Sequence, residues 1–209
     1  MVEQRGYRSS RREQQARRTR RRILDAATAV FLERGYAGAT MRAIAAAAGV
    51  AVPTVELAFG TKARLLKAAI DVAIAGDDQA VPVLDRGWAD TARQARTAEE
   101  FLAVVADVIA GAQTRSAGLV LAVFEGAHTD PDLAGLATQL TAQRATTARW
   151  LVDAMARITP LRSTADATDD LWLLMDPAVF HRLVRHRGWT PRRYADWFAR
   201  SASHLLIPD

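Results

Sequence analysis

The stretch over residues 40–62 carries side chains whose types and spacing suit contact with an anionic, hydrogen-bonding partner. Arg42 has the forked guanidinium that can donate two parallel hydrogen bonds, and Lys62 carries a charged ammonium. Thr54 and Glu56 add hydrogen-bond acceptors between apolar residues. The chain has no glycine-rich phosphate loop, no G-x-S-x-G elbow and no His-Glu-x-x-His pair. These side chains therefore indicate binding rather than catalysis.

Two short helices joined by a tight turn are needed to position these side chains. Thr40 can cap a helix that begins at Met41, and Gly49 can adopt the positive φ that ends it. Pro53 suits the first turn of a second helix, predicted over residues 52–59, because its missing N–H has no helical partner there. Four apolar residues are expected to form a small core beneath both helices: Ile44, Val50, Val55 and Phe59. Such a helix-turn-helix presents a helix to DNA.

A further helix is predicted on each side of this pair. Residues 23–33 place apolar side chains at the spacing of one buried stripe, and Gly35 ends that helix. Thr61 can cap a following helix over residues 62–75. Residues 23–68 are therefore expected to form a helix-turn-helix DNA-binding domain.

Positive charge is concentrated at the amino-terminal end of the chain. Residues 1–22 hold nine arginines and two glutamates, a segment charge of +7, so the net charge of +5 leaves −2 for the rest. We interpret residues 1–22 as a basic arm that reaches the phosphate backbone, since each neutralised phosphate releases counterions. For residues 1–12 the alternative is a disordered, solubilising tail. Residues 17–22 adjoin the first helix and are expected near DNA.

Residues 69–209 also show a helical pattern, and no strand is predicted. Three pairs, Asp130-Pro131, Asp176-Pro177 and Thr190-Pro191, combine a capping side chain with a proline that suits the first helical position. Helices are expected over residues 97–111, 118–127, 132–157, 165–175, 177–187 and 191–206. The predicted fold class is all-α, with an amino-terminal three-helix helix-turn-helix domain and a larger helical domain over residues 69–209.

The residues around the tight turn resemble a known family. The segment AGVAVPTVELAFGTKARLL, preceded by ILDAATAVFLERGYAGATMRAIA, is similar to the DNA-binding domain of the TetR family of bacterial transcriptional regulators. The resemblance implies a homodimer that binds a palindromic DNA operator as a repressor, with residues 69–209 as its ligand-binding and dimerisation domain. The sequence shows neither an export signal nor a membrane span, so a cytoplasmic location is expected. The resemblance also implies a small-molecule effector in the larger domain that weakens operator binding. The alternative within DNA binding is a constitutive protein without an effector.

The family's DNA contacts are carried over position by position. The resemblance implies that Arg42 reaches a base edge or a phosphate and that Lys62 binds a phosphate at a helix amino terminus. It also implies that Val52 and Pro53 contact thymine methyl groups and that Thr54 bonds to a phosphate or base. The DNA-binding candidates are Arg17, Arg18, Arg20, Thr40, Arg42, Val52, Pro53, Thr54, Glu56, Leu57 and Lys62.

The predicted recognition helix departs from the family pattern at two positions. Glu56 replaces a tyrosine that commonly contacts phosphate, and Ala58 stands where histidine is frequent. Phosphates repel a carboxylate, but cytosine N4 can donate a hydrogen bond to it. Glu56 therefore either specifies a base or pairs with an arginine, such as Arg42 or one in the arm.

Large apolar residues in the carboxy-terminal region suggest two further surfaces. The carboxy-terminal helices carry more of them than one body needs, so a dimer interface is expected, with ordinary core as the alternative. The interface candidates are Trp172, Phe180, Leu183, Val184, Tyr194, Trp197 and Phe198. A mainly apolar pocket for a hydrophobic or aromatic effector is expected in the larger domain. Its candidates, each of which could equally be core, are Phe101, Phe124, His128, Trp150, Met155, Trp172 and Met175.

Several classes of site are not expected. The chain has no cysteine, which excludes disulfides, thiolate zinc sites, iron–sulfur clusters and cysteine nucleophiles. Glu125 and His128 form one Glu-x-x-His pair, whereas di-metal carboxylate sites need two, so neither metal nor cofactor is predicted. No run approaches the roughly eighteen apolar residues of a membrane span, so no membrane partner is expected. An enzyme is the competing class, and no motif supports it.

Overall fold

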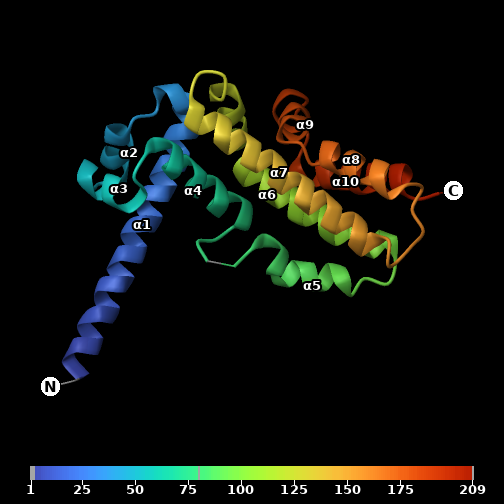
Figure 1. The fold of residues 1–209 in the computed structure, drawn as a ribbon, viewed down its shortest axis with the longest axis horizontal. Helices are drawn as coiled ribbons and strands as arrows, with labels where there is room; N and C mark the ends of the chain where they lie inside the picture. Colours follow the sequence, from blue (N-terminus) through green and yellow to red (C-terminus); the bar gives the residue numbers. More distant parts are fainter. Residues whose placement is uncertain (1–2, 80, 209) are drawn as a thin grey trace. The chain divides into compact units, whose positions relative to one another are not determined.

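The computed structural model describes the backbone of residues 3–79 and 81–208, and within these ranges the side chains from Arg12 onward. These residues are helical and include no strand, which confirms the predicted all-α class (Figure 1). The chain divides into two compact units, the first ending at Val72 and the second beginning at Ala73.

The first unit contains the predicted helix-turn-helix. Its helices are α1 (Glu3–Gly38), α2 (Met41–Ala48), α3 (Val52–Phe59) and the first part of α4 (Lys62–Ala75). The bounds of α3 and α4 are those predicted from the sequence. The Thr40 hydroxyl accepts a hydrogen bond from the Ala43 N–H at 3.1 Å, and Gly49, at a φ of 63°, ends α2. The local capping signals therefore set these helix ends.

A small apolar core holds α3 in place. The direction of the chain turns by 107° between α2 and α3. Ile44, Val55 and Phe59 are buried as predicted, whereas Val50 is only half-buried. Further buried side chains come from α1 and α4 and include Ile23, Leu24, Phe31, Leu65, Leu66 and Ile70.

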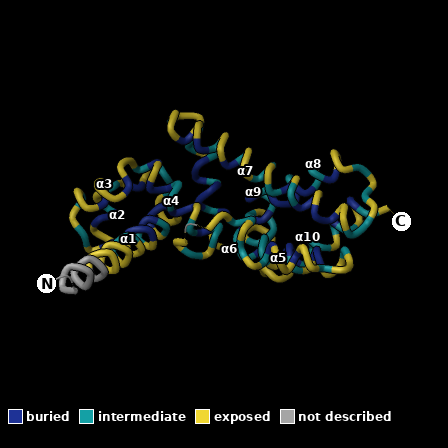
Figure 2. The backbone as a smooth tube through the Cα atoms, turned by 60° about the horizontal axis from the view of Figure 1, so that its bottom comes forward, coloured by how far each residue is buried: buried dark blue, intermediate teal, exposed yellow. Residues whose placement is uncertain are grey.

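The helix α1 is longer than the sequence pattern predicted. Its backbone is helical from Glu3, so the basic segment over residues 3–22 continues the predicted helix instead of forming a separate tail. Strong helix formers dominate the sequence RREQQARR at residues 11–18, which favours this continuation. The side chains of residues 12–18 are exposed (Figure 2). Gly35, with a φ of 64° and a ψ of 177°, interrupts α1 where the sequence predicted its end.

The second unit is built around one long helix, α6 (Ala98–Gly126), against which four others pack. These are α5 (Gly87–Arg93), α7 (Pro131–Met155), α9 (Pro177–His181) and α10 (Pro191–Leu206), while α8 (Thr164–Leu174) packs on α7 and α10 (Figure 1). A short 3-10 helix, η1 (Val83–Asp85), precedes α5, and a π-helical turn, η2 (Arg182–His186), follows α9. The bounds of α10 are those predicted.

Three sequence predictions for this unit were wrong. Residues 97–111 and 118–127, predicted as two helices, belong to one helix, α6. Glycine within a helix destabilises it by about 1 kcal/mol relative to alanine, but burial of the apolar residues on both sides of Gly111 outweighs this loss. The predicted helix 177–187 is α9 plus the π-helical turn. The predicted helices included neither η1 nor α5; the Trp88 Nε1–H donates to the Val83 carbonyl at 2.8 Å and links the two.

The length and composition of α6 also satisfy the criteria for a membrane span. Its most apolar 18-residue window has a mean hydropathy of 1.2, and 44% of that window is buried inside the fold. The sequence prediction that no segment approaches this limit therefore has an exception in the described residues. Burial against the neighbouring helices accounts for the apolar character of α6.

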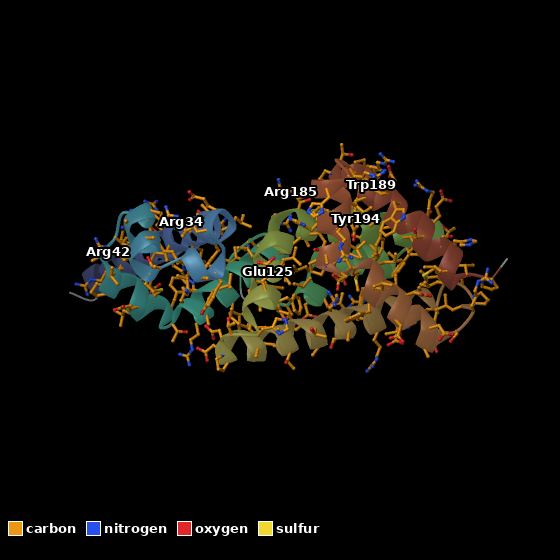
Figure 3. All side chains as sticks on the ribbon, turned by 90° about the horizontal axis from the view of Figure 1, so that it is seen from above. Arg34, Arg42, Glu125, Arg185, Trp189 and Tyr194 are labelled. Carbon is orange, nitrogen blue, oxygen red and sulfur yellow. The ribbon has the colours of Figure 1, made fainter. Side chains whose placement is uncertain are left out.

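Two polar side chains satisfy the buried carboxyl end of α8. The Tyr194 hydroxyl donates to the Leu174 carbonyl at 2.8 Å, and the Gln113 amide donates to the Met175 carbonyl at 2.6 Å. Tyr194 points inward from α10 (Figure 3) and is fully buried. Burial, and then the charge of Asp176, raise the pKa of the Tyr194 phenol, so the hydroxyl keeps the proton that it donates.

Replacing Tyr194 by phenylalanine should lower the free energy of unfolding by about 1–3 kcal/mol, because the buried Leu174 carbonyl loses its donor. Urea denaturation followed by tryptophan fluorescence measures this change. The matched control is Thr146→Val, which removes an exposed hydroxyl bonded to the Ala142 carbonyl and should change stability by no more than about 0.5 kcal/mol. Equal effects of the two substitutions would contradict the role assigned to Tyr194.

Candidate nucleic-acid interface

The outer face of α3 is exposed over most of its length. Val55 and Phe59 point into the small core, while Pro53, Thr54, Glu56, Leu57 and Ala58 are exposed and Val52 is half-buried. Leu57 is 92% exposed, an unusual state for leucine that leaves its whole side chain free for an external contact. This helix can therefore enter a groove without rearrangement of its own core.

The cap residue and the arginine of α2 have different roles. Thr40 is exposed but uses its hydroxyl to cap α2, so its position is explained by the fold. Arg42 extends from α2 into solvent (Figure 3) and has no ion pair within the described part of the chain. Arg42 is thus available for the predicted contact with a base edge or a phosphate.

Lys62 has a structural role that the sequence did not reveal. Its ammonium donates to the Tyr36 carbonyl at 2.8 Å and to the Ala39 carbonyl at 3.0 Å, and it lies 4.0 Å from the centre of the Tyr36 ring. These carbonyls follow the break in α1, so Lys62 connects that region to the start of α4. Two of its three N–H groups are used inside the protein, which leaves one for the predicted phosphate.

The arginines of α1 fall into two groups. Arg17 and Arg18 are exposed, as a contact with phosphate requires. Arg20 lies over the Phe59 ring, with its guanidinium carbon 4.5 Å from the ring centre. Arg22 donates to the Ala48 carbonyl and, at 3.2 Å, to the Gly49 carbonyl, so it caps the carboxyl end of α2. No sequence signal reveals this cap, because the partners are 26 and 27 residues apart.

The structure disperses the predicted effector residues over several environments. Three are buried in the apolar core of the second unit, namely Phe101, Met155 and Met175. Three are half-buried, namely Phe124, Trp150 and Trp172, while His128 is exposed in the turn after α6.

A polar contact missed by sequence reasoning lies beside these residues. The Arg144 guanidinium pairs with Asp176 at 2.8 Å and covers the Trp172 ring at 4.1 Å. Burial lowers the pKa of Arg144, while Asp176 acts in the opposite direction. The Gln113 side-chain oxygen nearby is buried and has no hydrogen-bond partner in the described residues.

An open hollow of about 420 Å³ lies between α7 and α8, and none of the predicted effector residues lines it. The residues that line it are Arg149, Val152, Asp153, Thr164, Ala165, Thr168 and Asp169. Among the described residues, no three histidine or carboxylate side chains gather in a way that could hold a metal ion.

The predicted dimer residues also differ in exposure. Phe180, Tyr194 and Phe198 lie in the core of a single chain, where they pack on one another and on α6, so they have little surface to offer a partner. The four that remain half-buried are Trp172, Leu183, Val184 and Trp197. Of the seven candidates, these four keep surface that a second copy of the chain could contact.

Comparison with known proteins gives a family for the first unit. Residues 23–69 match the model of the bacterial regulatory proteins of the tetR family. None of the curated proteins compared with the chain matches it. The match covers the last part of α1, the helices α2 and α3 and the first part of α4, and so includes the exposed face described above.

Solved structures share the fold of the whole chain. The regulator FadR from Bacillus subtilis, in complex with stearoyl-CoA, has a TM-score of 0.66 at 17% identity, over 87% of this chain and 96% of that one. A putative regulator from Saccharomonospora viridis, in complex with choline, has a TM-score of 0.65 at 17% identity, over 91% and 98%. A TetR regulator from Chloroflexus aurantiacus has a TM-score of 0.64 at 23% identity, over 92% and 98%. Residues 23–69 thus match the DNA-binding domain of the tetR family of bacterial regulatory proteins, and the solved regulators share the fold of the chain.

Proposed function

We propose that this protein is a homodimeric transcriptional repressor that binds a palindromic operator and is released from it by a small, mainly apolar effector. The observation that carries the DNA-binding part is the exposed face of α3, where Thr54, Glu56 and the 92% exposed Leu57 lie on a helix held by its own buried face. The helix-turn-helix docks such a face in the major groove.

Electrostatics supports a second DNA contact from α1. The exposed residues 12–18 extend beyond the small core as a polar helix, and Arg17 and Arg18 have no ion pair in the described residues. A helix that is polar on all sides gains little from packing, so an anionic partner would stabilise it. The phosphate backbone next to the groove is such a partner.

The proposal of an effector rests on the second unit and on its structural neighbours. The buried residues of α6 are apolar except for Gln113 and Ser116, so a pocket opened beside this helix would be mainly apolar. The unpaired oxygen of Gln113 could accept one hydrogen bond from a ligand. Two neighbours carry small molecules, stearoyl-CoA and choline respectively. To release the operator, the effector must bind the state that cannot bind DNA more tightly than the state that can. The coupling free energy between effector binding and DNA binding is then about 1–3 kcal/mol.

The half-buried group of Trp172, Leu183, Val184 and Trp197 supports the proposed dimer. Leu173, the next residue after Trp172 on α8, is 56% exposed and adds an apolar side chain to this region of the surface. Two copies of α3 related by a two-fold axis would read two half-sites of one palindrome.

The double variant Thr54→Ala, Leu57→Ala should bind the operator about 10- to 100-fold more weakly and keep its stability, because both side chains are exposed. Selection from random duplexes identifies the operator, and titration then measures the loss. Leu32→Ala is the matched control, since Leu32 is 53% exposed in the same unit but lies on α1. If the double variant binds the operator as tightly as the wild type, the side chains of α3 do not recognise the operator.

Replacing both Arg17 and Arg18 by glutamine should weaken binding to all duplexes alike. The slope of log Kobs against log salt should become shallower by about 1.8, because two phosphate contacts are lost. Binding titrations at several salt concentrations measure this slope. An unchanged slope would show that these side chains do not bind phosphate in the complex.

The effector can be sought by screening apolar and amphipathic compounds for release of the operator from the protein. A releasing compound should also raise the unfolding temperature of the free protein, since it binds the folded state. Compounds that stabilise the protein but never release DNA, or no stabilising compound at all, would favour a constitutive repressor without an effector.

A further inference from the structure

We infer that Glu56 reads a base and sets a preference for cytosine at one position of each half-site. This inference rests on the proposed function, because it requires α3 to enter the major groove. Glu56 places a carboxylate on the exposed face of α3, where the phosphates of DNA would repel it. The carboxylate therefore lowers affinity unless DNA offers it a hydrogen-bond donor.

Glu56 has no partner for its side chain within the described part of the chain. Its backbone carbonyl accepts a hydrogen bond from the Gly60 N–H at 2.7 Å, but no ion pair or hydrogen bond of its carboxylate is present there. Arg42, the partner considered from the sequence, extends into solvent without contacting it. The acceptor sites of the carboxylate are thus available to an external donor.

Docking α3 in a groove would remove water from this carboxylate, and a desolvated charge needs donors in return. Two bases offer a donor in the major groove, cytosine at N4 and adenine at N6. The adenine donor lies beside the N7 acceptor of the same base, which repels a carboxylate. Cytosine presents its donor without such an acceptor on the same ring, so the charge of Glu56 favours cytosine.

The composition of α3 leaves few side chains besides Glu56 that can recognise a base through a hydrogen bond. Within the sequence VPTVELAF, Thr54 and Glu56 are the residues with hydrogen-bonding side chains. Pro53, Leu57 and Ala58 can make only apolar side-chain contacts, for which thymine methyl groups are the partners. The Thr54 hydroxyl can both donate and accept, whereas the Glu56 carboxylate only accepts, so Glu56 is the residue of α3 that favours the cytosine donor.

The test is selection from random duplexes with the wild type, Glu56→Ala and Glu56→Gln, followed by titration of the enriched sequences. The wild type should enrich a palindrome with cytosine at one position of each half-site. Glu56→Ala should lose that preference, with discrimination at the position falling about tenfold. Glu56→Gln should prefer adenine there, because an amide can bind N6 and N7 together. The other positions should stay unchanged.

The matched control is Glu33→Gln, which removes the same charge from the same unit at a side chain that is 69% exposed on α1. This control variant should bind every duplex either as tightly as the wild type or uniformly more tightly. Its base preference should be unchanged. Circular dichroism verifies that every variant is folded.

Two results would overturn the inference and leave the proposed function intact. One is the same palindrome for the wild type and both Glu56 variants. The other is an equal loss of affinity for every duplex in both variants, which would show that Glu56 pairs with an arginine in the complex. Absence of any palindrome with the folded wild type would instead contradict the proposed function itself.

Discussion

Two cationic side chains in the first unit bind backbone carbonyls at helix ends, and the position of α3 depends on them. Arg22 satisfies the last carbonyls of α2, and Lys62 satisfies those of Tyr36 and Ala39 after the break in α1. Hydrogen bonds from charged groups to carbonyls contribute about 1.5–3 kcal/mol each. Because α2 and α3 have only eight residues each, such contacts and the small core must replace the stability that longer helices supply.

The same cations limit what the DNA interface can use. Lys62, Arg20 and Arg22 are engaged with the protein, whereas Arg17, Arg18, Arg42 and Arg64 are exposed. Among these arginines, Arg64 lies beside Gly60 at the end of α3. The face of α3 itself is mostly apolar and carries one negative charge. Binding strength should therefore come mainly from phosphate contacts outside α3, while base selection falls to a few side chains on it.

In the second unit, hydrogen bonds from distant side chains secure the end of a buried helix. Tyr194 and Gln113 reach the carboxyl end of α8 from α10 and α6, and the Arg144–Asp176 pair lies at the same turn. Side chains from α6, α7 and α10 thus meet the carboxyl end of α8 at residues 174–176. The side-chain oxygen of Gln113, which has no hydrogen-bond partner in the described residues, lies at this junction.

The sequence by itself determined the helix ends that depend on local chemistry. These local signals set helix ends through contacts within a few residues, so the bounds of α3, α4 and α10 could be predicted. They are the Thr40 cap, the positive φ of Gly49, the break at Gly35 and the helix start at Thr190-Pro191. Tertiary structure decided the rest. Gly111 stays helical because its neighbours along α6 are buried. Tyr194 and Phe198 lie in the core of a single chain and not at its surface. Lys62 and Arg22 bind backbone carbonyls that are more than twenty residues away along the chain. Such contacts join residues that are distant along the chain, and no local pattern specifies them.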